Sequence, residues 1–151
     1  AHRLDAAKLR ERLMQLYFTL SPYPEVPDTL RRLKAAGLTT AILSNGSLPM
    51  LKAAARSAGI ETLIDAIFSV DAVGVYKPDR RVYALATDGL GLAPQAISFQ
   101  SSNAWDAHGA KLQGFRVVWC NRLRQPAERL PGAPDAEIAT LTALPAIVAP
   151  D

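Results

Sequence analysis

The stretch Thr39–Gly59, TTAILSNGSLPMLKAAARSAG, contains the signals of a strand, a turn and a helix in immediate succession. TTAIL (39–43) is rich in β-branched and apolar residues and predicts a strand buried on both faces. SNGS (44–47) predicts a turn, and the following residues predict a helix that begins near Leu48. A doubly buried strand joined directly to a helix is typical of a parallel sheet covered by helices.

The same alternation continues on both sides of this stretch. Further strands are predicted at IFSV (67–70), AISF (96–99), FRVVWC (115–120) and, as a short segment, EIA (137–139). Helices are predicted over 5–20, from about Pro27 to Ala36, within 75–91 and over 104–114. A last helix is predicted over 141–149, with an interruption at Pro145. Strands that alternate with helices over short connections predict an α/β fold with a doubly wound parallel sheet.

Composition limits the classes of function. The chain has 151 residues, of which 49% are hydrophobic, enough for one domain with a core. Its apolar runs are too short to span a membrane and no signal peptide is recognised, so cytoplasmic localisation is the default expectation. The net charge of +3 is spread along the chain without a basic block, which argues against nucleic acid as a partner. The single cysteine, Cys120, is expected to be a buried apolar residue.

Polar residues collect where the predicted strands end. Ser44 and Asn45 follow the first strand, Asp71 to Lys77 follow the second, Ser101 to Asp106 the third, and Asn121 with Arg122 the fourth. In parallel α/β sheets, ligands bind outside the carboxyl ends of the strands. These four segments are therefore the candidate site.

Three of these segments, LSNG (43–46), VDAVGVYKPD (70–79) and SSNAWD (101–106), resemble in order and wording the haloacid dehalogenase (HAD) superfamily, in particular its type II L-2-haloacid dehalogenases. The likeness runs from about residue 20 to residue 122. It implies a HAD-like Rossmannoid core at residues 23–151, preceded by the C-terminal part of a helical cap and a return linker at residues 1–22.

The resemblance assigns Ser44 and Asn45 to binding of the substrate carboxylate, with Asn45 also facing the leaving halide. A hydroxyl, an amide and backbone N–H groups before a helix suit an anion. A serine N-cap followed by an Asn-Gly turn explains the same residue types.

Lys77 is implied to orient a nucleophilic aspartate and keep it ionised. Its position before Pro78 favours an extended backbone, and a buried ammonium needs a negative partner. A solvated loop lysine is the alternative. Tyr83 resembles a tyrosine near the same site, although the segment VYALA (82–86) also predicts a core helix face.

SSNAWD is implied to hold the nucleophile and the hydrolytic water through Ser101, Asn103 and Asp106, with Asp106 also pairing with Lys77. In phosphatases of the superfamily two carboxylates of this loop help bind magnesium, but Asn103 replaces the first of them, which favours metal-independent chemistry with no metal and no cofactor. Trp105 is expected to line the substrate pocket or to lie in the core. His108 is a weak candidate base, because its helical direction is expected to be away from the strand ends.

The chain departs from the family pattern in three features, of which the missing first strand matters most. No strand that ends in aspartate precedes Ser44, and Asp71, which follows a strand, is better explained as a loop or cap residue. The cap arginine is also unmatched, since Arg3, Arg10 and Arg12 lie in other contexts, and Gln100 is polar where an apolar residue is usual. We therefore expect the first strand, with its nucleophilic aspartate, to be missing from this chain.

The resemblance implies hydrolytic dehalogenation of short (S)-2-haloacids to (R)-2-hydroxyacids through an aspartyl ester. The partners it implies are a small 2-halocarboxylate and water, with a possible homodimer. Two alternatives stay open: a HAD-type phosphatase, and an inactive remnant or interaction module of this fold, for which the missing aspartate is the main support.

Overall fold

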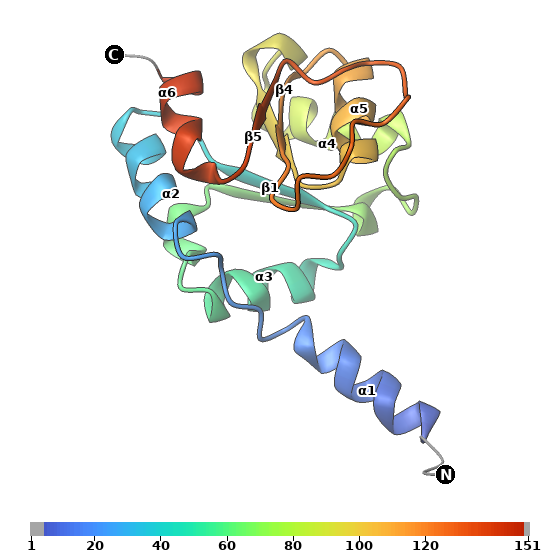
Figure 1. Ribbon diagram of the computed structural model, residues 1–151. Coiled ribbons are helices and arrows are strands. Elements are labelled where there is room, and N and C mark those ends of the chain that lie inside the picture. The colour runs from blue at the N-terminus through green and yellow to red at the C-terminus, as the bar shows by residue number, and fades with distance from the viewer. Residues whose placement is uncertain (1–4, 150–151) are drawn as a thin grey trace.

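Strands and helices alternate along residues 5–149, the part of the chain that the computed structural model describes (Figure 1). The strands are β1 (Ala41–Ser44), β2 (Ala66–Ser69), β3 (Ser98–Ser101), β4 (Arg116–Cys120) and β5 (Ala136–Ile138). The helices are α1 (Ala6–Leu16), α2 (Val26–Ala35), α3 (Leu48–Ser57), α4 (Arg80–Leu90), α5 (Ala104–Leu112) and α6 (Leu144–Val148). Every strand pairing is parallel, and the predicted α/β fold is confirmed.

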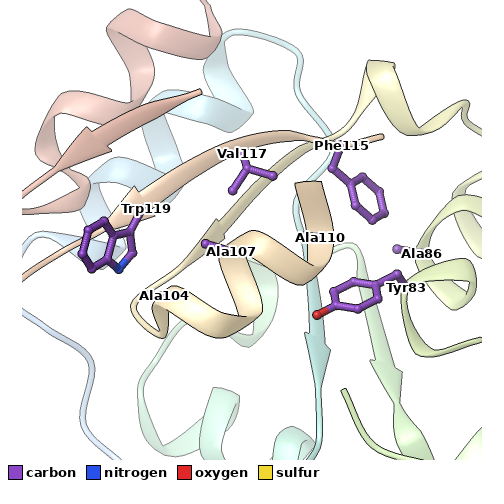
Figure 2. Close-up of a cluster of buried hydrophobic side chains, with 8 residues drawn as sticks. All are labelled: Tyr83, Ala86, Ala104, Ala107, Ala110, Phe115, Val117 and Trp119. Carbon is purple, nitrogen blue, oxygen red and sulfur yellow. The ribbon is translucent and has the colours of Figure 1, made fainter. Parts of the chain in front are cut away.

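The core is covered on both faces, as the alternation of side chains along β4 shows. Val117 and Trp119 are buried against α4 and α5, whereas Val118 and Cys120 are buried against α2, β5 and α6. Figure 2 shows the first of these clusters, in which alanines of α5 lie beside β4 and Tyr83 of α4 points toward α5. Small residues in α5 let this helix approach the strands closely. The doubly wound arrangement therefore follows from the pattern of the buried strand.

The strands do not form one continuous sheet. β1 pairs with β2, and β3 pairs with β4, which pairs with β5, but the hydrogen-bonded ladders leave β1 and β3 unjoined. The prediction that strand 39–43 is buried on both faces is wrong: Ala41 is exposed, and Ile42 and Leu43 are only half-buried. The reason is that β1 has a hydrogen-bonded neighbour on one side alone, so its other side stays accessible.

Helix α1 projects away from the rest of the molecule (Figure 1). Asp5 caps it, and it ends at Leu16, not at residue 20 as the periodicity predicts. Its apolar face has no cover among the described residues, and Leu13 and Leu16 are more than half exposed. The segment that follows is anchored at Glu25, whose carboxylate pairs with the half-buried Arg122.

Two further boundaries differ from the predictions. The predicted strand 96–99 begins later, because Pro94–Ala96 form a 3-10 turn, and this places Gln100 and Ser101 within β3. The predicted helix 141–149 is divided into a 3-10 turn and α6, with Pro145 in the first turn of α6. Prolines are tolerated there because the first turn needs no internal N–H donors. Across the described residues, no helix has the length and apolar character needed to cross a membrane.

Candidate active site

A buried ion pair lies at the carboxyl-end edge of β1 and β3, between the two sheets. The Lys77 ammonium is 3.1 Å from Oδ2 of Asp106, and both side chains are only 7% exposed. The Tyr83 hydroxyl donates to the other carboxylate oxygen, Oδ1, at 2.8 Å. Lys77 also donates to the carbonyl oxygen of Leu43 at 2.9 Å. The alternative of a solvated loop lysine is therefore wrong.

Local structure fixes each member of this cluster. Asp106 occupies the first turn of α5, which begins after Asn103, and its own N–H donates to the Asn103 carbonyl. Tyr83 is carried by α4, whose first turn is capped by Asp79. The structure fits both interpretations of Tyr83, as a core residue and as a residue near the site. The side chain is 1% exposed in the core, and its hydroxyl donates to Asp106. Lys77 thus ties β1 to α5 across the separation between the two sheets.

Burial and the charge of Asp106 have opposite effects on the pKa of Lys77 and the same effect on the pKa of Tyr83. Burial lowers the pKa of Lys77 below its usual range, and the attraction of Asp106 offsets only part of this effect. For Tyr83, burial and then the Asp106 carboxylate raise the phenol pKa well above its ordinary value of 10.0. The Lys77 ammonium also lies 4.8 Å from the centre of the Phe99 ring, a further favourable contact for a cation.

The loop after β1 is held by hydrogen bonds from three directions. Ser44 Oγ accepts from the Gly46 N–H, and Asn45 Oδ1 accepts from the backbone N–H of Lys77. The N-cap residue of α3 is Ser47, whose side chain forms no capping bond, and the Leu48 N–H donates to the Asp71 carboxylate. The N-cap alternative for Ser44 is therefore wrong, and Asp71, interpreted from the sequence as a loop or cap residue, lies in the 3-10 turn after β2 and accepts from the start of α3.

The loop after β3 is more exposed than the ion pair beside it. Ser101 Oγ accepts from the backbone N–H of Asn103, whose own side chain is exposed and forms no capping bond to α5. Trp105 is 39% exposed, so its alternative placement in the core is wrong. The buried indole is Trp119, whose Nε1 donates to the carbonyl of Ser102.

His108 and Gln100 point to other parts of the fold. His108 is buried and its Nδ1 lies 3.1 Å from the carbonyl of Pro131, in the connection between β4 and β5, as its helical direction predicts. Gln100 donates to Ser98 Oγ within β3. Arg10 and Arg12 lie on exposed α1, and Arg3 lies outside the described residues.

Two groups that contact Lys77 were not predicted from the sequence. The Leu43 carbonyl and the Phe99 ring both contact the Lys77 ammonium. Neither residue type signals such a role, and only the convergence of two strand ends brings them there. Within residues 5–149 there is no cluster of three or more His, Cys, Asp or Glu side chains of the kind that holds a metal ion.

The sequence profile of a haloacid dehalogenase-like hydrolase family matches residues 3–114. The chain belongs to the haloacid dehalogenase-like hydrolases. Ser44 at the end of β1, Lys77 between β2 and α4, and Asp106 in α5 after β3 come from distant parts of the sequence.

Similar proteins point to one branch of the family. The chain is 49% identical over 138 residues to an (S)-2-haloacid dehalogenase of Pseudomonas sp. (strain YL), covering 91% of this chain and 60% of that protein. It is 43% identical to (S)-2-haloacid dehalogenase 1 of Pseudomonas sp. (strain CBS-3), covering 96% of this chain and 64% of the relative. The chain therefore spans about 60% of the length of these curated relatives.

A solved structure of L-2-haloacid dehalogenase from Xanthobacter autotrophicus, with chloropropionic acid covalently bound, superposes with a TM-score of 0.88 at 35% identity. The match covers 97% of this chain and 68% of that one. The resemblance to type II L-2-haloacid dehalogenases is thus confirmed.

Proposed function

We propose that the protein containing this chain hydrolyses the carbon–halogen bond of short (S)-2-haloacids and releases (R)-2-hydroxyacids. The observation that carries this proposal is the Lys77 ammonium, buried between Asp106 and the end of β1, at the strand ends where a carboxylate nucleophile is needed. The relatives named above support the substrate class.

The first chemical step requires a carboxylate that attacks C2 of the substrate. One carboxylate oxygen forms a bond to C2, the carbon–halogen bond breaks with inversion, and the halide leaves with the bonding electron pair. In this proposal the aspartate belongs to a strand outside these 151 residues. Lys77 keeps that aspartate ionised, since a buried cation favours the charged form of a neighbouring acid.

The second step hydrolyses the resulting ester. Water attacks the carboxyl carbon of the aspartyl ester, which restores the aspartate and releases the hydroxyacid and a proton. In this proposal Ser101 and Asn103 position the water, while Asp106 holds Lys77 in place and Tyr83 orients Asp106.

Substrate binding is assigned to the loop after β1 and to Trp105. The Asn45 oxygen is already used by the Lys77 N–H, which leaves its NH2 group available to the substrate or the departing halide. The Ser44 hydroxyl can donate to the substrate carboxylate while it accepts from Gly46. Trp105 is sufficiently exposed to contact the C2 substituent. We also propose that residues 1–22 are the C-terminal part of a helical cap and that residues 23–151 form the core domain. The protein is proposed to act as a homodimer.

Chloride release tests the proposal. The polypeptide encoded by the intact reading frame is incubated with (S)- and (R)-2-chloropropionate, with magnesium or with EDTA. We expect release from the (S) form alone and no effect of EDTA. Magnesium-dependent hydrolysis of p-nitrophenyl phosphate without chloride release would instead establish a phosphatase. Silence in both assays would support the third alternative, an inactive remnant or interaction module of this fold.

A further inference from the structure

Trp119 is a buried aromatic residue near the carboxyl end of β4 whose indole reaches the loop after β3. The side chain is 4% exposed and lies in one cluster with Ala104 and Ala107 of α5 (Figure 2). Its Nε1 donates to the backbone carbonyl of Ser102 at 3.2 Å. A buried indole N–H needs an acceptor, and here the acceptor belongs to the loop to which we assign the hydrolytic water.

The peptide group between Ser102 and Asn103 is held at both of its polar atoms. Its oxygen, the Ser102 carbonyl, accepts from Trp119. Its N–H, that of Asn103, donates to Ser101 Oγ at 3.1 Å. Because a peptide group is planar, bonds at its two opposite ends restrict rotation of the whole plane. The directions in which Ser101 and Asn103 extend from the backbone are thereby fixed.

The same arrangement leaves polar groups of the loop available to a ligand. Asn103 is the N-cap residue of α5, yet its side chain forms no capping bond, and the N–H groups of Asp106 and Ala107 donate to its backbone carbonyl. An N-cap asparagine usually bonds its side-chain oxygen to the helix. The Ser101 oxygen accepts from the Asn103 N–H, so the hydroxyl proton of Ser101 is free to be donated.

Strand pairing places Trp119 where it can support this loop. In the parallel ladder of β3 and β4, Ser101 is the register partner of Trp119. The backbone of β4 therefore holds the strand end from which the loop departs, while the indole holds the loop itself. Such support matters for catalysis, because a displacement of about 1 Å can lower a rate by about 100-fold.

We propose that Trp119 is a positioning residue for hydrolysis of the ester. Its indole N–H holds the Ser102 carbonyl so that Ser101 and Asn103 present water to the carboxyl carbon of the ester. Trp119 acts through this loop and does not itself contact the substrate. The inference rests on the proposed function, because the ester and its hydrolysis belong to that function.

The variant Trp119→Phe, made in the polypeptide encoded by the intact reading frame, removes the indole N–H and keeps an aromatic ring in the core. Ester formation releases chloride before the positioned water is needed, and only the later cleavage of the acyl–oxygen bond by water is slowed. We expect a stoichiometric burst of chloride from (S)-2-chloropropionate, an ester adduct in the mass spectrum, and a kcat lower by about tenfold to 100-fold. The ratio kcat/KM should change little, because it reports the steps up to the ester.

Val117→Ala is the matched control. Val117 lies in the same strand and the same cluster and is 0% exposed, so its truncation loosens the core but keeps the indole N–H. This control should show neither a burst nor an adduct. A loosened core alone predicts that kcat and kcat/KM of Trp119→Phe fall together without an adduct, and that result would overturn the proposal.

Hydrogen exchange followed by NMR tests the support of the loop without any chemistry. The indole N–H of buried Trp119 should exchange more slowly than that of Trp105, which is 39% exposed. The Asn103 amide should exchange faster in Trp119→Phe than in Val117→Ala, and equal exchange in the two variants contradicts the proposal. If this exchange pattern is found but the wild type releases no chloride, the proposed function is contradicted while the support of the loop by Trp119 is upheld.

Discussion

The Tyr83 hydroxyl lies 2.8 Å from Asp106 Oδ1, on the opposite side of the carboxylate from the Lys77 ammonium. Both oxygens of Asp106 are therefore occupied, and the carboxylate cannot rotate without losing a bond. This fixes the position of Lys77, the group to which we assign control of the nucleophile. In the proposed function, the buried phenol would act on the nucleophile only through Asp106 and Lys77.

Replacement of Tyr83 by phenylalanine tests the hydrogen bond from Tyr83 to Asp106. Tyr83→Phe keeps the ring contacts with Phe99 and Phe115 but removes the donor to a buried carboxylate. Hydrogen bonds to charged groups contribute about 1.5–3 kcal/mol, so we expect the free energy of unfolding to fall by about 2 kcal/mol. Urea denaturation measures it. Tyr76→Phe, at a side chain that is 66% exposed, is the matched control and should change little.

Gly109 offers an independent way to displace the same hydroxyl. A Cβ at this position of α5 would lie 2.6 Å from the Tyr83 oxygen and 3.2 Å from Pro78 Cβ. Glycine to alanine within a helix normally stabilises by about 0.5–1 kcal/mol. We expect the opposite sign for Gly109→Ala. If the variant melts at a higher temperature than the wild type, the packing of Tyr83 against α5 is not as described.

The sequence predicts the order and type of the elements well because each strand and helix carries a local signal. TTAIL, AISF and FRVVWC mark strands through β-branched and apolar residues, and β4 is buried as its composition requires. The split between β1 and β3 has no such signal. Whether a strand edge is paired depends on residues far away in the chain or outside it, so Ala41 can be exposed although its neighbours predict burial.

The same distinction applies to the candidate site, where motifs predict which residues act together but not how deeply they are buried. The motifs indicate that Lys77 and Asp106 act together, and the structure brings them to 3.1 Å. Their burial, and the choice between Trp105 and Trp119 as the core indole, depend on how α5 lies over β4. Helix periodicity does not decide that choice, because the two tryptophans are in different elements.

The alkaline pH dependence of stability should report on Tyr83. Its pKa in the folded chain is raised above 10.0, the value of an ordinary phenol. Below pH 10 the phenol is protonated in both states, and its contribution to stability is complete. Above pH 10 the unfolded chain loses this proton first, so stability falls by about 1.4 kcal/mol per pH unit until the folded pKa is reached.

Comparison of the wild type with Tyr83→Phe isolates this effect, because Lys77 and Cys120, whose pKa values are also shifted by burial, are present in both proteins. The difference in unfolding free energy should be constant up to pH 10 and then shrink. A difference that stays constant up to pH 11 would mean that the phenol ionises normally in the folded chain.

The ion pair itself is tested by a double-mutant cycle on Lys77 and Asp106. Lys77→Met leaves the carboxylate buried with Tyr83 as its remaining donor, and Asp106→Asn leaves the ammonium buried without a counter-charge. Removing one partner of a buried pair costs about 3–5 kcal/mol, whereas removing both is often close to neutral. We therefore expect the double variant to be more stable than either single variant in urea denaturation. Additive losses would show that the two charges do not interact, and Lys77 would then be free to move away from the strand ends at which a nucleophile must be held.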